Sequence, residues 1–526
     1  MQLRSLAVIC LILAMAPRHI HSQEANKSSS TAPQTSVIHV DAKSEGTPFP
    51  HFWEQIFGSG RAILTLRESY RDDLRAVKKV TGLQAIRFHG IFHDEVGFFD
   101  LDANGHPVYN FSYIDQIYDG LLANGARPFV ELSFMPRKLA SDPSALHAFW
   151  YKQNVSPPKD YALWDGMITA FAQHLVDRYG IDEVSQWYFE VWNEPNLDFW
   201  GGKPLQPTYF ELYDHTSAAL KKVNSRIRVG GPSSAQAAWV ASFLDHAKQS
   251  GAPVDFVSSH VYANDTSKDV FQTDEVIPRD RMVCRSVRKV HDEIAASPFP
   301  KLPLIFSEYN ASYANEPNVT DTVYMGPWLA TTFSQCDGLT EAMSYWTISD
   351  VFEEQGVVKT PFYGGFGLIA EDSIPKPALN AFAMLHELGD RRIKIDSDSA
   401  IATRRSDGTI VMALWNYAPP FGTGPTYTPP PANPGPDKAF TVKLAGVAPN
   451  ASAQLWRLDA EHGNVLKTYD AMGRPAFLTR DQITRLREAA KPSPPEQVAL
   501  KEGSLTVNIP PQGLVVLEVR NGKSTY

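Results

Sequence analysis

Apolar runs of strand length and amphipathic runs of helix length alternate along most of the chain. From residue 52 onward, eight runs rich in aromatic and β-branched residues are each followed by a helical pattern or by a loop long enough to hold a helix. These predicted strands cover residues 52–58, 84–88, 127–134, 187–192, 226–231, 255–260, 302–307 and 341–346. Eight such units in succession predict an α/β fold, the (β/α)8 TIM barrel, in which parallel strands close into a ring inside a ring of helices.

Apolar residues at helical spacing predict the helices of this barrel. Gly180 follows one of them, where a C-terminal glycine is favoured, and Pro377 opens the last, where its missing N–H is tolerated. The loops after the second and eighth strands are long, and the eighth covers residues 348–376. The expected helices cover residues 68–80, 113–123, 162–179, 208–223, 237–249, 281–295, 322–334 and 377–388.

The pattern changes near residue 391, where short alternating runs replace the strand–helix repeat. We expect a barrel over residues 44–390 and an antiparallel β-sandwich over residues 391–526, with an early strand at 36–43 joining the sandwich. Thr479 and Gln482 form a capping-box pattern that predicts one helix within the second region. The expected strands there cover residues 410–415, 440–444, 454–458, 497–500, 504–509 and 514–519.

The N-terminus has the pattern of a signal peptide over residues 1–22. Arg4 precedes an apolar run over residues 6–16 that is too short to span a bilayer, and small or polar residues follow it. An N-terminal anchor is the alternative interpretation. A polar lead-in over residues 23–35 is expected to be disordered. We therefore expect a secreted or periplasmic protein.

Export changes how the cysteines are interpreted. Cys284 and Cys336 are the two cysteines outside the predicted signal peptide, and an oxidising compartment permits a disulfide between them. Two free buried cysteines are the alternative. Glycosylation in a suitable host is equally open at the Asn-x-Ser/Thr sequons, which include Asn110, Asn154, Asn264, Asn318 and Asn450.

Charge and composition narrow the class of partner. The formal net charge of −9 argues against nucleic acid and against anionic membrane surfaces. Aromatic residues make up 11% of the chain, which suits a protein that stacks rings against flat faces such as those of sugars. We expect a small oligosaccharide or glycoside as the partner, no nucleic acid and no membrane, and we leave a homo-oligomer open.

Two glutamates follow buried runs on different predicted strands. Glu194 comes just after the fourth strand, which Pro195 ends because proline has no N–H to donate, and Glu308 comes just after the seventh. The C-terminal ends of barrel strands meet at one rim, where two carboxylates can flank a glycosidic bond. We predict Glu194 as the catalytic acid/base and Glu308 as the nucleophile, with Asn193 binding a sugar hydroxyl next to the anomeric carbon.

Further motifs, most of them at strand ends, extend this picture. They are Trp192-Asn193-Glu194-Pro195-Asn196, Arg87-Phe88-His89-Gly90, Ser259-His260-Val261-Tyr262, Ser307-Glu308-Tyr309-Asn310, Ser349-Asp350-Val351-Phe352-Glu353-Glu354 and Trp456-Arg457-Leu458-Asp459. Together they resemble glycoside hydrolase family 39, the β-xylosidase and α-L-iduronidase family, over nearly all of residues 37–519. The pattern at the eighth loop is similar to that of the xylosidase branch.

The resemblance implies roles for the other strand-end residues. His89, His260 and Tyr262 would contact sugar hydroxyls or orient the nucleophile. Trp346 would form an apolar floor for the sugar ring, although a purely core role is the alternative. Glu353 or Glu354 would bind hydroxyls at the closed end of the pocket, unless they lie on a solvated loop. The family resemblance implies no metal and no cofactor.

We therefore interpret the chain as a secreted retaining exo-glycosidase that removes terminal β-D-xylosyl residues from xylo-oligosaccharides. Other family 39 specificities remain as alternatives: α-L-arabinopyranosidase, β-glucosidase, β-galactosidase or an α-L-iduronidase-like activity. The last would need a cation to meet the sugar carboxylate, whereas the eighth loop offers Glu353 and Glu354. A non-catalytic carbohydrate-binding protein on the same barrel is the alternative from another class.

Overall fold

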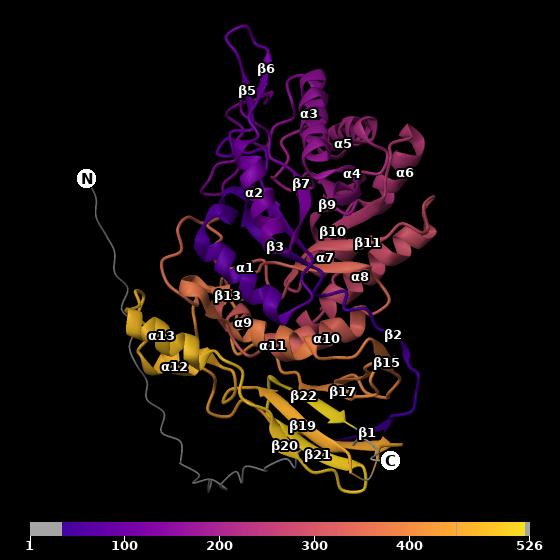
Figure 1. Cartoon of the computed structure of the whole chain (residues 1–526), viewed down its shortest axis with the longest axis vertical. Coiled ribbons are helices and arrows are strands. Elements are labelled where there is room, and N and C mark those ends of the chain that lie inside the picture. The colour runs from indigo at the N-terminus through magenta and orange to yellow at the C-terminus, as the bar shows by residue number, and fades with distance from the viewer. Residues whose placement is uncertain (1–33, 449, 521–526) are drawn as a thin grey trace, which may run out of the picture.

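The protein is a closed parallel barrel to which a second region of β-sheet is attached (Figure 1). The computed structural model describes residues 34–448 and 450–520, so the predicted signal peptide lies outside the described residues. The barrel order is β3-β4-β7-β8-β9-β10-β11-β12, which confirms the predicted TIM barrel. These strands are Ile56–Arg61, Ala85–His89, Arg127–Leu132, Tyr188–Val191, Arg228–Ser234, Phe256–Tyr262, Leu304–Asn310 and Ala342–Tyr345.

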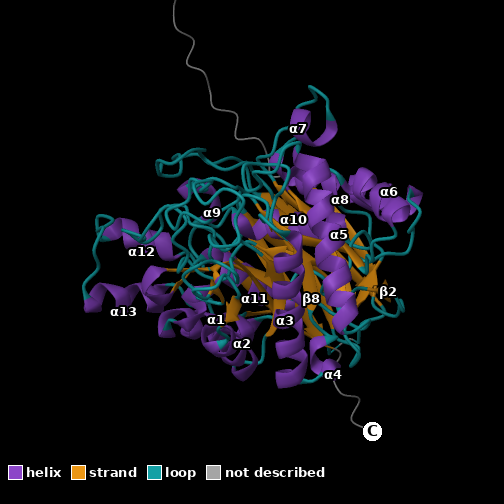
Figure 2. Cartoon of the chain, turned by 90° about the horizontal axis from the view of Figure 1, so that it is seen from above, coloured by secondary structure: helices purple, strands orange, loops and turns teal. Residues whose placement is uncertain are grey.

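Helices surround the barrel strands, as the view from above shows (Figure 2). Their apolar faces pack on the strands, and their bounds fall within a few residues of the expected ones. The larger helices are α1 (Glu68–Val80), α2 (Ser112–Ala123), α3 (Tyr161–Tyr179), α5 (Leu205–Val223), α6 (Val240–Ser250), α8 (Arg279–Ala296), α10 (Met325–Cys336) and α11 (Pro377–His386). Shorter ones are α4 (Ile181–Val184), α7 (Ser267–Phe271) and α9 (Pro317–Thr320).

Two predicted boundaries were wrong for clear physical reasons. The first barrel strand begins at Ile56 rather than residue 52, because Phe52 and Trp53 are buried as loop residues, with Trp53 stacked on Phe333 of α10 at 4.7 Å between ring centroids. The helix expected from residue 237 begins at Val240, because Trp239 before it is left-handed, with φ of 64°. Apolar character alone does not distinguish a buried loop from a strand.

Several elements were not predicted at all. The long loop after β4 contains a hairpin of β5 (Phe99–Leu101) and β6 (Pro107–Tyr109), which projects at the top of Figure 1. The loop after β12 contains β13 (Ile369–Ala370) and β14 (Ile374–Pro375). Such strands of two or three residues are too short to show a periodic pattern.

Two sheets follow the barrel in space and share one hydrophobic cluster. The first has the order β2-β15-β16-β17-β22-β19-β20 and the second β1-β18-β21. Residues of β1 pair in parallel with β18, so the early strand does join this region, two residues sooner than expected. The strands are Thr47–Pro48, Arg391–Ile393, Ala400–Arg404, Ile410–Asn416, Gly513–Arg520, Ser452–Leu458 and Glu496–Val498, then Gln34–Asp41, Lys438–Ala445 and Ser504–Ile509.

Two helices, α12 (Val465–Ala471) and α13 (Arg480–Ala489), accompany these sheets. The capping box of Thr479 and Gln482 opens α13, as its sequence pattern predicts. Cys284 of α8 and Cys336 of α10 form a disulfide, which settles the choice that the sequence left open. Within residues 34–448 and 450–520, no helix combines the length and apolar character that crossing a membrane would require.

Candidate active site

A cavity of about 780 Å³ opens at the C-terminal ends of the barrel strands. Seven of the nine predicted site residues line it: His89, Asn193, Glu194, Tyr262, Glu308, Trp346 and Glu354. His260 lies beneath the lining, in contact with Glu194, and Glu353 lies outside the lining. The barrel therefore brings together residues that are up to 265 positions apart in the chain, as His89 and Glu354 are.

Glu194 follows β8 on a tight, left-handed turn. Trp192 and Glu194 both have positive φ, of 71° and 44°, a conformation that is unfavourable for residues with a Cβ and needs support from the fold. The Glu194 N–H donates to the Ser233 carbonyl at 2.8 Å, and the Trp192 indole N–H donates to the Phe199 carbonyl at 2.8 Å. These bonds fix the turn that holds the Glu194 carboxylate at the cavity wall.

Glu308 lies within β11 and is held from two sides. The Arg87 guanidinium donates to one carboxylate oxygen at 2.7 Å, and the Tyr262 hydroxyl donates to the other at 2.6 Å. His89 Nε2 lies 3.8 Å from the first of these oxygens. A carboxylate oxygen of Glu194 and one of Glu308 lie within 4.8 Å of each other, and the His260 ring lies in the same group.

A fully buried arginine organises the floor of the cavity. Arg87 of β4 makes ion pairs of 2.6 Å with Glu190 and 2.8 Å with Glu131, besides its bond to Glu308, and it donates to Asn193 Oδ1 at 2.9 Å. Buried charges are tolerated when they are paired and hydrogen-bonded in this way. Because Arg87 occupies the Asn193 oxygen, the amide nitrogen of Asn193 is the group that remains to face a ligand in the cavity.

The roles of Arg87, Glu131 and Glu190 were not predicted from the sequence. Each is a fully buried charged residue in a barrel strand, and the three strands are neighbours, so these side chains must find partners inside the barrel. That signal was available in the sequence, because a charge in the middle of a predicted interior strand indicates either a wrong assignment or a buried network.

The two glutamates differ in their electrostatic surroundings. Burial raises the pKa of both carboxyl groups. For Glu194 the neighbouring Glu308 carboxylate adds to burial and places the pKa well above its ordinary value. For Glu308 the charges of Arg87 and His89 and the hydrogen bond from Tyr262 oppose burial, so its pKa rises less. Glu194 is therefore the group that retains a proton while Glu308 is ionised.

His260 supports Glu194 without adding a charge. Its Nδ1 lies 2.9 Å from Glu194 Oε1, and its Nε2 lies 3.1 Å from the Ser307 hydroxyl, which donates in turn to Glu190 at 2.5 Å. Burial, reinforced by the charges of Arg87 and His89, lowers the pKa of His260 well below its ordinary value. A neutral imidazole orients Glu194 but does not favour loss of its proton.

Trp346 and His89 form an aromatic corner in the cavity. Their ring centroids lie 4.7 Å apart, and the His89 Nδ1 lies 2.7 Å from Glu131 Oε2. Gly58 of β3 packs against the indole so closely that a Cβ there would lie 2.3 Å from a ring carbon of Trp346. The missing side chain at Gly58 thus creates the space that the Trp346 ring fills.

The adjacent residues Glu353 and Glu354 have different surroundings. Glu353, at a positive φ of 65°, forms ion pairs with Arg61 at 3.0 Å and with Arg67 at 2.5 Å. Glu354 lines the cavity 3.8 Å from His89 Nε2, and burial followed by repulsion from Glu308 raises its pKa well above its ordinary value. Of the pair offered by the sequence, Glu354 is the one placed to meet a ligand.

The rim of the cavity is aromatic and partly exposed. Trp150 is 53% exposed and Tyr313 is 55% exposed, and both line the cavity together with Phe149 and Phe199. Flat apolar faces at an open rim suit sugar rings or aromatic leaving groups. A metal ion at Glu194, His260 and Glu308 is disfavoured, because the Arg87 guanidinium already neutralises Glu308 at 2.7 Å.

Known proteins resemble this chain over most of its length. The sequence profile described as "Glycosyl hydrolases family 39" matches residues 36–505. A beta-xylosidase of Geobacillus stearothermophilus is 38% identical over 504 residues, covering 93% of this chain and 97% of the relative. A beta-xylosidase of Caldicellulosiruptor saccharolyticus is 34% identical over 488 residues, covering 90% and 96%.

Among solved structures, a monomeric beta-xylosidase from Caulobacter crescentus CB15 superposes with a TM-score of 0.83 at 35% identity, covering 92% of this chain and 99% of that one. The family match spans the barrel, the cavity and most of the two following sheets. This chain therefore belongs to glycosyl hydrolase family 39 and is a glycoside hydrolase.

Proposed function

We propose that the protein is a secreted, retaining exo-β-xylosidase that removes terminal β-D-xylosyl residues from xylo-oligosaccharides. The observation that carries the proposal is the pair formed by Glu194 and Glu308, whose carboxylate oxygens lie within 4.8 Å across one cavity. Retaining glycosidases place their two carboxyl groups about 5–5.5 Å apart, whereas inverting ones need about 6.5–9.5 Å to admit a water molecule. The full-length relatives described as beta-xylosidases support the choice of sugar.

In the first step the ionised Glu308 attacks the anomeric carbon of the terminal xylose. The glycosidic C–O bond breaks as the new ester bond forms, and Glu194 donates its proton to the departing oxygen. In the second step the ionised Glu194 removes a proton from water, the water oxygen attacks the anomeric carbon, and the Glu308 carboxylate leaves. Two inversions give net retention of configuration.

The surrounding side chains prepare these steps. Arg87 and Tyr262 hold both oxygens of Glu308, so the attacking carboxylate keeps one orientation. The Asn193 amide would donate to a hydroxyl next to the anomeric carbon, and such a bond strengthens as positive charge develops there. Tyr262 gives up its bond to one Glu308 oxygen as that oxygen becomes esterified.

Three side chains that line the cavity support specificity for a terminal, neutral sugar. A terminal ring would stack on Trp346 and hydrogen-bond with His89 and Glu354. A sugar carboxylate would meet the Glu354 carboxyl group there, which disfavours an iduronide. The exposed aromatic rim at Trp150 and Tyr313 is where the leaving group would lie.

We further infer an accessory β-sandwich domain after residue 390 and export directed by residues 1–22. The shared hydrophobic cluster between the two sheets supports the first inference. The disulfide between Cys284 and Cys336 supports the second, because such bonds persist in oxidising compartments.

The test is hydrolysis of a panel of aryl glycosides: β-xyloside, α-arabinopyranoside, β-glucoside, β-galactoside and α-iduronide. A preference for the β-xyloside, with β-xylose as the first product seen by proton NMR, is the expected result. Preference for another glycoside would overturn the sugar assignment, and α-xylose as the first product would overturn the retaining mechanism. No turnover of any member by folded protein would favour a non-catalytic sugar-binding protein.

A further inference from the structure

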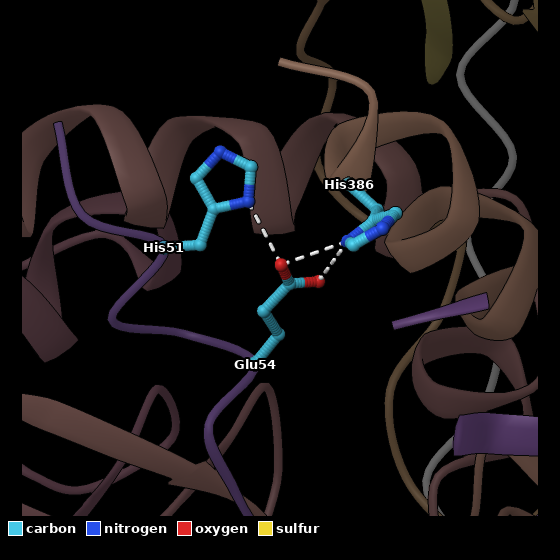
Figure 3. A group of neighbouring side chains, drawn as sticks. All are labelled: His51, Glu54 and His386. Carbon is cyan, nitrogen blue, oxygen red and sulfur yellow. Dashed lines mark hydrogen bonds and ion pairs between the residues drawn. The ribbon is translucent and has the colours of Figure 1, made fainter. Parts of the chain in front are cut away.

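Three side chains that commonly bind metals meet at the base of the barrel, at the end opposite the candidate active site. His51 and Glu54 lie in the segment between β2 and β3, and His386 is the last residue of α11. Figure 3 shows the two imidazole rings approaching the Glu54 carboxylate from two sides. Glu54 precedes its barrel strand, whereas Glu194 and Glu308 lie at the C-terminal ends of theirs, so the length of the strands separates the two groups.

The three side chains are already in contact. His51 Nδ1 lies 2.8 Å from Glu54 Oε1, and His386 Nδ1 lies 2.8 and 3.0 Å from the two carboxylate oxygens. One such atom from each residue lies within 4.8 Å of the other two. Glu54 is 2% exposed, whereas His51 is 21% and His386 is 41% exposed. The carboxylate is thus fixed in the interior while the histidines form an accessible outer edge.

The donor set is one that zinc prefers. Two imidazole nitrogens and a carboxylate bind zinc and similar divalent ions, and water completes the coordination. Zinc–ligand bonds of about 2.0–2.1 Å in tetrahedral geometry place the ligand atoms roughly 3.3 Å from one another. Each imidazole nitrogen now lies 2.8 Å from Glu54 Oε1, so these atoms would move apart by about 0.5 Å to admit an ion. Stacking of the His51 ring on Trp53, with centroids 4.5 Å apart, holds that ring in place.

The charges around this group also suit a cation. The Glu54 carboxylate lies against two imidazole rings, 2.8 Å from His51 Nδ1 and 2.8 Å from His386 Nδ1. Glu387, which follows His386 in the chain, is paired with Arg405 at 2.5 Å, so these two opposite charges offset each other. No fixed cation pairs with Glu54 among the described residues, in contrast to Arg87 at Glu308.

We propose that His51, Glu54 and His386 form a structural site for a divalent transition-metal ion of the zinc type, separate from the catalytic residues. Such an ion would clamp the start of the barrel to its end, because Glu54 and His386 are 332 positions apart in the chain. The neighbouring backbone already joins there: the Phe49 N–H donates to the Asp390 carbonyl at 2.8 Å, and β2 pairs with β15.

Binding to the folded state alone raises the melting temperature by mass action. We therefore expect zinc to raise the melting temperature by several degrees and to leave turnover of a β-xyloside unchanged in kcat. The experiment uses the full chain without a polyhistidine tag, stripped of metal with a chelator. Equilibrium dialysis against Zn²⁺ should find one ion per chain, whereas Mg²⁺, which prefers oxygen ligands, should give no shift.

Three variants assign the ion to this group. His386→Ala and His51→Ala should each weaken zinc binding by more than about 100-fold and remove the thermal shift. Losing a residue that only hydrogen-bonds to a metal ligand weakens binding by up to about 100-fold, and losing a ligand should cost more. His246→Ala is the matched control, because His246 is also partly exposed and bonded to one carboxylate, Asp214, at 3.0 Å. It should bind zinc as the parent does.

The proposal has clear ways to fail. Equal zinc binding by the parent and by His386→Ala would overturn it. The absence of bound zinc would also overturn it and would show that the three side chains form a hydrogen-bonded cluster without a metal. Loss of binding in Glu308→Gln but not in His51→Ala would assign the ion to the catalytic group instead. Parent-like β-xylosidase activity of metal-free His386→Ala would show that this variant is folded. If the protein hydrolyses a different glycoside, activity on that glycoside serves as the same folding control.

Discussion

The mouth and the base of the barrel each hold three close histidine and glutamate side chains, yet their surroundings differ. At the mouth two glutamates and His260 lie above Arg87, whose guanidinium is 2.7 Å from Glu308. At the base a single glutamate lies between two histidines that are partly exposed. A fixed cation holds a carboxylate for attack and disfavours a metal ion, whereas a carboxylate that contacts only imidazole rings, themselves ligands of zinc, can bind one. The same residue types therefore support different chemistry.

The largest effect should come from removing Glu308, the proposed nucleophile at the mouth. Glu308→Ala should lower kcat on an aryl β-xyloside by at least about 10⁴-fold, because no covalent intermediate can form. Steady-state kinetics measures the loss. Added azide should restore some turnover, giving the α-glycosyl azide, since a small anion fits the vacated space. Residual activity above one part in a hundred, without azide, would contradict the role of Glu308.

Removing Glu194, the proposed acid/base, should give a smaller loss that depends on the leaving group. Glu194→Ala should lower kcat/KM by about 10²–10⁴-fold on xylobiose, whose leaving oxygen needs a proton. An aryl xyloside with a good leaving group should lose less in the bond-breaking step. Parallel kinetics on both substrates makes the comparison, and equal losses would show that Glu194 does not act as the proton donor.

Substitutions at the two ends of the barrel should lower the free energy of unfolding by different amounts. Arg87→Met leaves Glu131, Glu190 and Glu308 buried without their cation, so it should lower the free energy of unfolding by about 3–5 kcal/mol. Metal-free His386→Ala should cost less, about 1–2 kcal/mol, because the buried Glu54 carboxylate keeps its contact with His51. Urea denaturation followed by circular dichroism measures both. Similar losses would mean that Arg87 is less tightly coupled to its partners than its contacts indicate.

The smallest effect concerns pH. The proposed mechanism needs protonated Glu194, whose pKa is raised, so kcat/KM should persist above pH 4.5 and decline as the pH rises through that raised pKa. Asp265, with a pKa raised by burial to about 7, contributes to this elevation once ionised. Asp265→Asn should therefore move the basic limb to lower pH, by less than about one unit.

A pH–rate profile checks this shift. Asp102→Asn, which removes a carboxylate in an outer turn between β5 and β6, is the control and should leave the limb in place. An unchanged limb in Asp265→Asn would show that the Asp265 charge does not reach Glu194.

The sequence predicts those site residues whose position is indicated by the pattern of residues next to them in the chain. Glu194 and Glu308 are found because each follows an apolar run at a strand end, where a barrel gathers its chemistry. The strands themselves are found because interior strands are almost wholly apolar. Arg87 is in one of the quoted motifs, yet its role depends on three partners from three other strands, which no local window contains.

Other features depend on geometry that sequence does not express. The opposite surroundings of Glu353 and Glu354 follow from the positive φ at Glu353, and the two residues look interchangeable in the chain. His51 and His386 are far apart in sequence and are joined only by closure of the barrel. The disulfide between Cys284 and Cys336 likewise depends on how α8 and α10 pack.

The pairing of β1 with β18 and of β2 with β15 has a consequence for any attempt to divide the protein. Strands from before the barrel complete both sheets that follow it, so the barrel is in effect an insertion between two parts of one β region. Ending the chain near residue 390 would leave β1 and β2 as unpaired edges, which invite association with other chains. An isolated barrel is better obtained by removing the β segments on both sides of it together. A circular permutation would instead join these two segments where they already meet and keep the β region whole.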